Sequence, residues 1–599
     1  MTAPVATINL PQASSVDELV ANRTQDSVND VVRVSVSDLA EQLRPLIIPA
    51  GSIDPVALED VPTTKVVHQI AGGVPFIMAD RLKDDRHLWD YITAANRTAS
   101  YDAHDELQAA LDTGEPFRLP AATVSFSGTL TISHDDCIIE GRGQRTILRH
   151  LDAAGDFFSA PANVKGLTWR DISFWALAPK TSGVVLRAYQ LQYAYFYDIR
   201  FGSKRLYSAA GYNTHYLVGA LDLDGFADVY VIGGENVVAG EAFYINGQVI
   251  GAGGNLLGAT AEDVDVEGYE DAQAYGAEFT IQGNHRSFRT KHLIRAGGAA
   301  GGVNVFDAEC SEPTGAAAVY DMSRIKAYNR EAKFVGSRLD NGRSWAVDVK
   351  GGCLTDLDAD ALWVSGFGQS NDGSGGWRFG PLSETTAPVT AKRKIEVRIA
   401  GGTTQKCYGS GFEFVEGKCR VGNHNISNNG LGSAGGHGFH AAGGSLISSL
   451  VLDGNTVDNN GSASAVIGGT PQGYGYRLDG AINKYTVSDT VLFSNESGPI
   501  YSDMGLQEGT HEISGLTGFQ TTKKGTVEWA TGSSTLVVNH NLGVTPRYDA
   551  VPIVVLAGTP PSTTYEPRII DKTATTTVWD MGGLNTSGGP ITCQWEVNL

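Results

Sequence analysis

The sequence predicts an all-β fold in which short strands stack as the coils of a solenoid. Three observations support this prediction. Glycine accounts for 73 of the 599 residues, well above a typical share of about 7%, and it separates short runs of apolar and β-branched residues. Two strand signatures recur through the middle of the chain. A helix, an alternating strand and a glycine turn follow one another where that region begins.

The charge balance narrows the set of partners. The chain has 45 Lys+Arg against 66 Asp+Glu, a formal net charge of −21. A phosphate backbone repels such a chain, so we do not expect a nucleic-acid partner. The first residues lack the basic and apolar parts of a signal peptide, and no apolar run of about 18 residues follows. We therefore expect synthesis in the cytoplasm and no membrane insertion.

The cysteines give no sign of a metal site. They show no CxxC pair and no zinc-like histidine spacing, so the sequence predicts small core residues. They are Cys137, Cys310, Cys353, Cys407, Cys419 and Cys593.

Residues 1–100 differ in composition from the rest of the chain. They contain little glycine, and prolines break them into short pieces. The segment Val31–Leu43 predicts a strand that runs into a helix capped by Ser37 or Asp38. We expect a small separate region here.

The segment from residue 104 to 148 predicts the first coil of the solenoid. Leu107, Ala110 and Leu111 fall on one helical face, and Gly114 ends the helix. The run ATVSFSGTLTIS then alternates strictly between apolar and polar residues. DCIIEGRGQRTIL follows, with two apolar pairs on either side of a glycine turn.

Internal repetition predicts a solenoid over residues 101–520. One signature is a polar residue followed by apolar, any, apolar; the other opens with glycine instead. The first recurs at Asp171–Phe174, Asp198–Phe201, Asp228–Val231 and Asp263–Val266, and the second at Gly240, Gly276, Gly302, Gly376, Gly411, Gly438 and Gly475. The sequences 428–430 and 459–461 are both Asn-Asn-Gly, which predicts asparagine turns stacked one coil above another. Residues 521–599 return to alternating strands and predict a small β-sandwich.

The pieces DELQAALD, RLP, TLTI, IIEGRG and TIL together resemble the start of the pectate-lyase-like right-handed parallel β-helix proteins. This chain has Ala121 and Ala122 where that family usually has a glycine. The resemblance implies a right-handed parallel β-helix with an N-terminal capping helix. The segment Val538–Tyr548 is similar to C-terminal sandwich domains of phage tail fibres and spikes.

The three-part layout resembles that of bacteriophage tailspikes. The resemblance implies a homotrimer in the virion, attached to the phage tail or baseplate through residues 1–100. It also implies that the β-helix binds, and usually cleaves, a bacterial capsule, exopolysaccharide or O-antigen. Two alternatives stay open: a binding-only receptor fibre, and a free polysaccharide lyase. The flanking regions and the missing signal peptide favour a tailspike over a free lyase.

Cleavage of a glycan needs one of two sets of residues. A hydrolase uses two carboxylates about 5–10 Å apart, and a lyase uses a base with a group that neutralises the substrate carboxylate. The sequence leaves both routes open, and it predicts neither a cofactor nor a metal.

Strand alternation predicts which side chains leave the core, because the middle residue of each apolar-any-apolar strand faces outward. The glycine-type strands then place one polar stripe outside: Glu278, Asn304, Arg378, Glu413, His440 and Arg477. The polar-first strands place a second set on an adjacent face: Tyr230, Asp265, Lys326, Trp363 and Arg398. Substrate-binding candidates are Lys326, Trp363, Trp377, Arg378 and His440, the tryptophans by stacking on sugars.

Asp307 and Glu309 follow a glycine-type strand and are the best catalytic candidates, together with Glu278 and Asp265. Turn formation by Asp307 and solvation of Glu309 are the ordinary alternatives. Glu413 and Asp372 come next if these candidates fail. The period-two carboxylates Asp356, Asp358 and Asp360 allow a calcium site, but no further ligand accompanies them, so we expect a solvated edge.

Overall fold

The computed structural model divides the chain into two compact units, Met1–Asp85 and Arg86–Leu599. In the first it describes residues 18–25, 28–35, 67–68 and 76–77. In the second it describes 86–202, 216–250, 256–257, 273–275, 278–387, 392–432 and 436–461, and, with gaps, parts of 466–516 and 522–598. The domain boundaries at 100 and 520 stay predictions.

The described part of the first unit contains two antiparallel pairs. β1 (Glu18–Gln25) pairs with β2 (Val28–Ser35), and β3 (Val67–His68) pairs with β4 (Phe76–Ile77). The strand predicted from Val31 thus begins at Val28, and the preceding hairpin strand was not predicted. The helix expected after Ser37 lies outside the described residues.

The predicted capping helix is α3 (His104–Asp112), which follows the 3₁₀ turns η3 (Leu88–Asp90) and η4 (Ala94–Asn96). Its buried face consists of Leu107, Ala110 and Leu111, as the periodicity predicts. Gly114 has φ +68°, the left-handed conformation that ends a helix. The helix is therefore confirmed in place, buried face and end.

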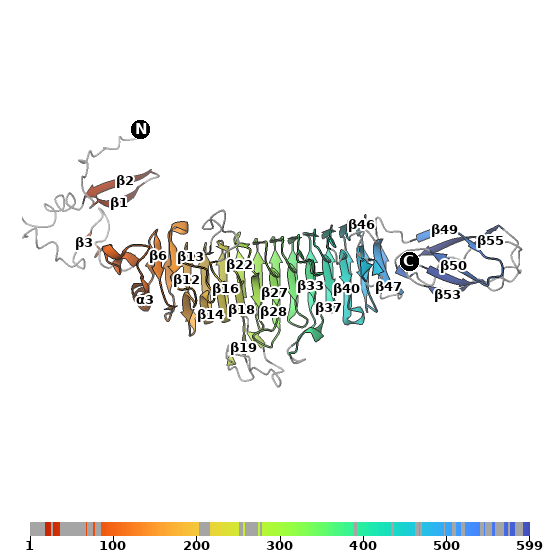
Figure 1. Ribbon diagram of the computed structural model, residues 1–599, viewed down its shortest axis with the longest axis horizontal. Coiled ribbons are helices and arrows are strands. Elements are labelled where there is room, and N and C mark those ends of the chain that lie inside the picture. Colours follow the sequence, from red (N-terminus) through yellow and green to blue (C-terminus); the bar gives the residue numbers. More distant parts are fainter. Residues whose placement is uncertain are drawn as a thin grey trace, which may run out of the picture. The chain divides into compact units, whose positions relative to one another are not determined.

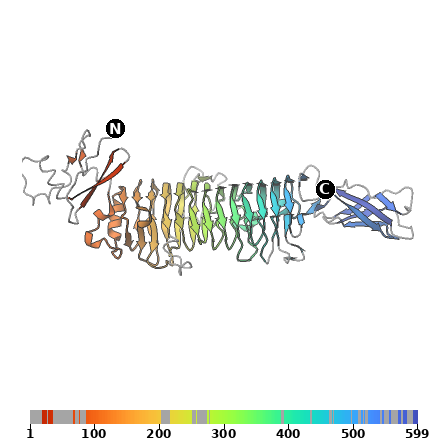
Figure 2. The same ribbon diagram turned by 90° about the horizontal axis from the view of Figure 1, so that it is seen from above.

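The repeating region is a parallel β-helix, which confirms the predicted fold class (Figures 1 and 2). Each coil contributes up to three strands, and strands of successive coils pair in parallel to form three rows. β14 (Val184–Tyr197) and β16 (Gly219–Ile232) run through rows 1 and 2 without a break, so both rows belong to one 27-stranded sheet, while row 3 is a 13-stranded sheet.

The strands of each row are as follows. Row 1 also contains β7 (Leu130–Thr131), β10 (Phe158–Ala160), β18 (Glu241–Asn246), β24 (His292–Ala296), β27 (Ala318–Tyr320), β30 (Val347–Val349), β33 (Trp377–Phe379), β36 (Phe412–Phe414), β39 (Phe439–Ala441), β44 (Tyr474–Leu478) and β47 (Gly498–Gly505). Row 2 also contains β5 (Phe117–Arg118), β8 (Ile138–Glu140), β12 (Thr168–Arg170), β22 (Glu278–Gln282), β25 (Gly302–Phe306), β28 (Asn329–Val335), β31 (Leu354–Asp360), β34 (Glu396–Ala400), β37 (Gly417–Gly422), β40 (Ile447–Asp453), β45 (Tyr485–Ser488) and β48 (His511–Ser514). Row 3 contains β6 (Thr123–Phe126), β9 (Ile147–His150), β13 (Ser173–Ala176), β15 (Arg200–Phe201), β17 (Glu235–Asn236), β23 (Arg286–Phe288), β26 (Glu309–Ser311), β29 (Arg338–Asp340), β32 (Trp363–Ser365), β35 (Thr403–Gln405), β38 (Asn425–Ser427), β41 (Thr456–Asp458) and β46 (Val491–Phe493).

The core is filled by like residues stacked along the coils, since parallel pairing in register puts each inward side chain above its counterpart. Phe174 stacks on Phe201 with ring centroids 5.8 Å apart, which confirms the predicted equivalence of those two repeats. A second column contains Trp377, Phe412 and Phe439. The ring centroid of Phe412 lies 5.7 Å from that of Trp377 and 5.6 Å from that of Phe439. The six cysteines are free and buried in this core or in that of the C-terminal sheets, as predicted.

Two of the three corners repeat a residue in the left-handed conformation. In the corner between rows 2 and 3, this position is filled in seven consecutive coils by Asp307, Gly336, Ala361, Gly401, Asn423, Gly454 and Asp489, with φ between 46° and 64°. Asp, Asn and Gly are the residues that adopt this conformation most readily.

The corner between rows 3 and 1 carries an asparagine ladder, which confirms the predicted stacked turns. Asn429 Nδ2 donates to Asn460 Oδ1 at 3.0 Å, and Asn460 Nδ2 donates to Asn495 Oδ1 at 2.9 Å. Asn429 and Asn460 are fully buried. Their amides satisfy backbone groups that burial would otherwise leave unpaired.

The segments that connect the rows differ strongly in length from one corner to another. Rows 2 and 3 are joined by as few as two residues, Asp307 and Ala308. Rows 1 and 2 are joined by longer segments, including 247–277 and 380–395, and rows 3 and 1 by segments such as 428–438 and 459–473. Row 1 therefore lies between the two corners that carry long connections.

The C-terminal residues form two three-stranded antiparallel sheets. One has the order β49 (Thr522–Trp529), β55 (Ile591–Asn598), β52 (Val554–Ala557), and the other β50 (Thr535–Asn539), β54 (Thr576–Asp580), β53 (Arg568–Lys572). Trp529, Trp579 and Cys593 are buried. This arrangement agrees with the predicted sandwich. None of the helices in the described residues is long and apolar enough to span a bilayer.

Candidate functional site

The outward side chains at the middle of the row 1 strands form one continuous column, which we call the polar track. Its members are paired in register from coil to coil: Arg187, Asp222, Tyr244, Arg295, Val319, Asp348, Arg378, Glu413, His440, Arg477 and Tyr501. Four of the six residues predicted to share a stripe, Arg378, Glu413, His440 and Arg477, occupy consecutive positions. That part of the prediction is confirmed.

The other two members of the predicted stripe lie elsewhere. Glu278 and Asn304 belong to β22 and β25 in row 2, where Asn304 is the register partner of Thr280. Glycine precedes or begins strands of both rows, so the glycine signature alone does not distinguish them. The prediction of a single six-residue stripe is wrong for these two residues.

The second predicted set is divided among three places. Tyr230 and Arg398 point outward from row 2, and Trp363 begins a row 3 strand with 42% of its surface exposed. Lys326 is exposed in the connection between β27 and β28. Asp265 lies outside the described residues. The described members do not share one face, because the polar-first signature occurs in both row 2 and row 3.

Trp377 does not face outward, so the prediction that it stacks on a sugar is wrong. Its side chain is fully buried, and its Nε1 donates to Thr404 Oγ1 at 3.0 Å. Arg378 is the outward residue of β33, and alternation sends its neighbour Trp377 into the core. Trp363 remains available for stacking.

At its N-terminal end the polar track is a dense ion network. Asp222, almost completely buried, is paired with Arg187 on the neighbouring coil and with Arg324. Arg324 also contacts Asp224 at 2.8 Å and lies 3.7 Å above the ring of Tyr244. Burial would lower the pKa of Arg324, but the hydrogen bond and charge of Asp222 outweigh it and raise the pKa above its usual value. These charges already satisfy one another, so this end is rigid.

In the middle of the polar track, Arg378 is shared between two carboxylates. Its guanidinium lies 3.0 Å from Asp348 and 2.7 Å from Glu384, and Lys350 contacts Asp348 at 2.9 Å. Beside it is a cavity of about 230 Å³, lined among others by Lys326, Lys350 and Glu384. This places two predicted binding residues, Arg378 and Lys326, at or next to the track.

Toward its C-terminal end the polar track carries a histidine, an arginine and two carboxylates. His440 Nε2 lies 2.9 Å from Asp479 Oδ2, and Arg477 Nε donates to the same carboxylate at 2.9 Å. Burial would raise the pKa of Asp479, but the hydrogen bonds from His440 and Arg477 lower it below its usual value. Glu413, one coil earlier, is 4.0 Å from Arg378 Nε and 31% exposed. Two carboxylates, an imidazole and a guanidinium thus lie close together at this end of the polar track.

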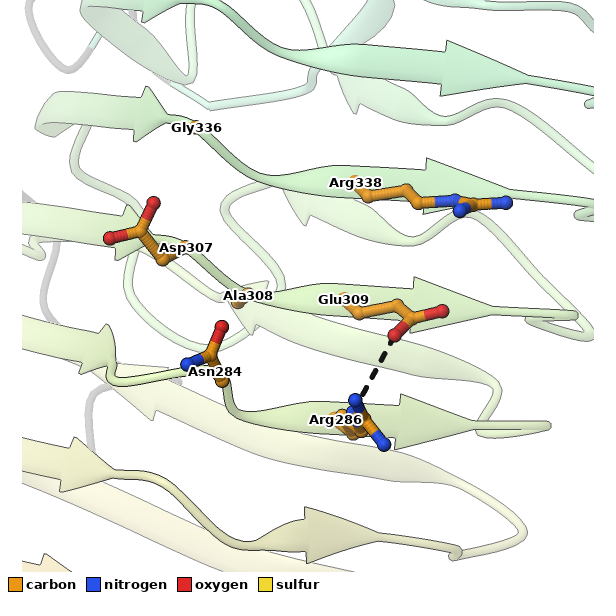
Figure 3. A pocket seen from close by; sticks show the side chains of 7 residues that line it. All are labelled: Asn284, Arg286, Asp307, Ala308, Glu309, Gly336 and Arg338. Atoms are coloured by element: carbon orange, nitrogen blue, oxygen red, sulfur yellow. Dashed lines mark ion pairs between the residues drawn. The ribbon is translucent and has the colours of Figure 1, made fainter.

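Asp307 and Glu309 lie together at a cavity of about 200 Å³ on row 3, shown in Figure 3 with Asn284, Arg286 and Arg338. The Glu309 carboxylate is 3.6 Å from Arg286 Nε. The carboxylates of Asp307 and Glu309 point away from each other in Figure 3. They share a cavity but do not face a common point.

Of the other two proposed members, Glu278 does not join this cavity. Glu278 is on row 2 and exposed, and Asp265 lies outside the described residues. Asp307 has φ 49° and occupies the corner position where other coils have Asn or Gly. The geometry therefore favours a turn-forming role for Asp307. Asp372, a reserve candidate, accepts hydrogen bonds from the backbone and hydroxyl of Ser374, as turn-forming aspartates do.

Asp356, Asp358 and Asp360 point outward from one strand, β31. Asp358 lies 3.5 Å from Arg398, and burial followed by the charge of Glu396 raises the pKa of Asp356. Within the described ranges no cluster of three or more His, Cys, Asp or Glu residues has a metal-binding arrangement.

Sequence reasoning missed Asp479, Asp222 and Arg324. Asp479 directly follows the strand that carries Arg477, and its position two residues later was a usable signal. Asp222 and Arg324 are 102 residues apart in sequence, and only the coiling of the chain brings them together.

No known protein family and no curated protein matches the sequence. Among solved structures, tailspike protein 3 of bacteriophage CBA120 is similar with a TM-score of 0.51 and 13% identity, over 84% of this chain and 75% of that one. The chain has the fold of phage tailspike proteins. The Dettilon tailspike protein is similar with a TM-score of 0.46 and 11% identity, over 90% and 98% of the two chains. The A-module of the Azotobacter vinelandii mannuronan C-5 epimerase AlgE6 is similar with a TM-score of 0.40 and 11% identity, over 73% of this chain and 100% of that one. The tailspike likeness concerns the fold.

Proposed function

We propose that this protein is a phage tailspike that recognises and depolymerises a bacterial surface polysaccharide during host adsorption. The observation that carries the proposal is the polar track on row 1, in which Val319 is the one apolar position among the eleven named, flanked by the two corners with long connections. The tailspike fold is consistent with it but does not by itself assign an activity.

The dimensions of the polar track suit an extended glycan. Its eleven positions follow one another at the spacing of paired strands, so it extends over roughly 50 Å. Arginine, carboxylate, histidine and tyrosine side chains alternate along it, and these groups can donate hydrogen bonds to sugar hydroxyls or accept them. A chain of several sugars would meet a new polar side chain on each of these coils except the one that carries Val319.

The enzymatic part of the proposal is tested by incubating the purified protein with capsular, exopolysaccharide and O-antigen preparations. A hydrolase produces new reducing ends, and a lyase also produces an ultraviolet-absorbing unsaturated uronate. Binding without either product would favour the alternative of a receptor-binding spike. If the protein neither bound nor cleaved any polysaccharide of the panel, that result would contradict the proposed function.

Assembly and location belong to the same proposal. The protein would act as a homotrimer in the virion, attached to the tail or baseplate through residues 1–100. The last coil of a β-helix exposes an unpaired strand edge, and a C-terminal domain can protect it. Deleting the residues after about 525 should therefore lower the trimer yield or the thermal resistance. A deletion variant that light scattering shows to be a stable trimer would move the trimer contacts to the β-helix.

A further inference from the structure

We propose that Glu413 and His440 are the acid–base pair that hydrolyses a glycosidic bond next to an uncharged sugar on the polar track. This inference rests on the proposed function and gives it a reaction and a place. It takes up Glu413, the reserve candidate, and His440, a predicted binding residue, in place of Glu278 on row 2 and Asp307 and Glu309 at the row 3 cavity.

His440 has the geometry of an imidazole oriented by a carboxylate. Its Nε2 is held 2.9 Å from Asp479 Oδ2, while 22% of the side chain stays exposed. Asp479 is fixed in turn by Arg477, whose Nε lies 2.9 Å from both of its carboxylate oxygens. A carboxylate that holds one ring nitrogen leaves the other free to face a substrate. Asp479 is thus a positioning residue.

Glu413 is the register neighbour of His440 on the preceding coil, so the two side chains leave the sheet about 4.8 Å apart. Its nearest cation, Arg378 Nε, lies at 4.0 Å, and that guanidinium is already bound to Asp348 and Glu384. Glu413 therefore keeps lone pairs for a water molecule. Carboxylate and imidazole on adjacent coils can flank one glycosidic bond of a glycan that follows the polar track.

An aromatic surface adjoins this pair. Tyr501 is the next track position after Arg477, and its ring lies 5.2 Å from that of Tyr474, which in turn stacks on His437 at 5.9 Å. His437 is buried, and the partly exposed rings of Tyr474 and Tyr501 offer an apolar face beside polar groups, which matches the two faces of a sugar ring.

The local charge favours hydrolysis over elimination. Elimination from a uronate needs a cation that is free to neutralise the substrate carboxylate. The cations nearest the pair are already bound to protein carboxylates: Arg378 and Lys350 to Asp348 and Glu384, and Arg477 to Asp479. None of these cations is left to neutralise a substrate carboxylate. An uncharged sugar needs no such cation.

The reaction balances with water as the only co-reactant. Glu413 takes a proton from a water molecule as the water oxygen forms a bond to the anomeric carbon. The bond between that carbon and the glycosidic oxygen breaks, and the departing oxygen takes a proton from Nδ1 of protonated His440. One new reducing end forms for each bond cleaved.

The test uses full-length protein with a panel of uncharged O-antigen polysaccharides and uronate-containing capsules. Wild type should release reducing ends from an uncharged polysaccharide without an unsaturated product. Glu413→Gln and His440→Gln should each lower turnover about 100-fold or more, with binding changed less than about threefold. Glu396→Gln is the matched control, because Glu396 is an outward carboxylate on row 2 that pairs with Arg398 at 2.8 Å, and its turnover should equal wild type.

The outcomes separate the inference from the proposed function. If wild type cleaves and both variants keep near wild-type turnover, or if the product is unsaturated, the inference is overturned and the tailspike proposal stands. If wild type neither binds nor cleaves any member of the panel, both are overturned. Melting temperatures of the variants, expected to match wild type, distinguish lost chemistry from lost folding.

Discussion

The corners of the β-helix and the polar track use the same residue types for opposite purposes. At the corners, Asn429 and Asn460 are fully buried and bonded to one another, and His424 is buried with its pKa lowered to about 4 by burial. On the track, Glu413 and His440 are 31% and 22% exposed and can reach a ligand. In a solenoid, the position within the coil determines whether a polar side chain supports the backbone or is available for binding.

The cavity of Asp307 and Glu309 combines features of the corners and of the polar track. It is open to solvent, yet Asp307 occupies a left-handed corner position and Glu309 is paired with Arg286. A carboxylate at the end of a strand can therefore serve the turn or an ion pair without facing a ligand.

The largest loss of stability should come from replacing the buried Trp377. Trp377→Ala removes a fully buried ring from the column with Phe412 and also the donor to Thr404. We expect a loss of about 3–5 kcal/mol of stability, measured as a lower melting temperature. If Trp377→Ala melted like wild type and instead lost glycan binding, the assignment of Trp377 to the core would be wrong.

Acidification should weaken the corners through their buried histidines. Burial lowers the pKa of His285 and of His424 from 6.5 to about 4. Between these pH values the unfolded chain binds more protons than the folded chain, so stability falls as the pH drops from 6.5 towards 4. The loss should reach about 3 kcal/mol for each histidine, seen in melting temperatures across this range. A melting temperature that did not change between pH 6.5 and pH 4 would contradict this prediction.

A smaller effect is expected at the corner aspartate. Asp307→Val places a β-branched residue at φ 49°, which should cost about 1–3 kcal/mol, while Asp307→Asn should keep both stability and turnover. Melting temperature and reducing-end release measure the two quantities. If Asp307→Asn or Glu309→Gln lost turnover with unchanged melting temperature, the row 3 cavity would be the catalytic site; Glu278→Gln tests the row 2 candidate in the same way.

The smallest effect on stability is expected for Trp363→Ala, because 42% of this side chain is exposed. The melting temperature should change little. If Trp363 stacks on a sugar, glycan affinity should fall by roughly 5–30-fold, equivalent to about 1–2 kcal/mol. Unchanged affinity would remove Trp363 from the binding residues and confine binding to row 1.

Much of the fold could be predicted from local patterns. The capping helix, its end at Gly114 and the stacked asparagine turns depend on short segments whose residue types allow few conformations. The alternation that exposes Arg378 and His440 is equally local. The same alternation assigns Trp377 to the core, and the prediction that it stacks on a sugar was wrong because it set that pattern aside.

The sequence by itself determined that the chain repeats, that glycine and asparagine turn it, and which residues of most strands face inward, because these properties depend on neighbours a few positions apart. Only the tertiary structure decided which strands share a row. Glu278 and Glu413 carry the same signature yet lie on different rows, while Asp222 and Arg324 meet across 102 residues. The physical reason is that connections of unequal length change the sequence distance between stacked positions, so the coils are aligned by backbone pairing and core packing and not by a fixed period.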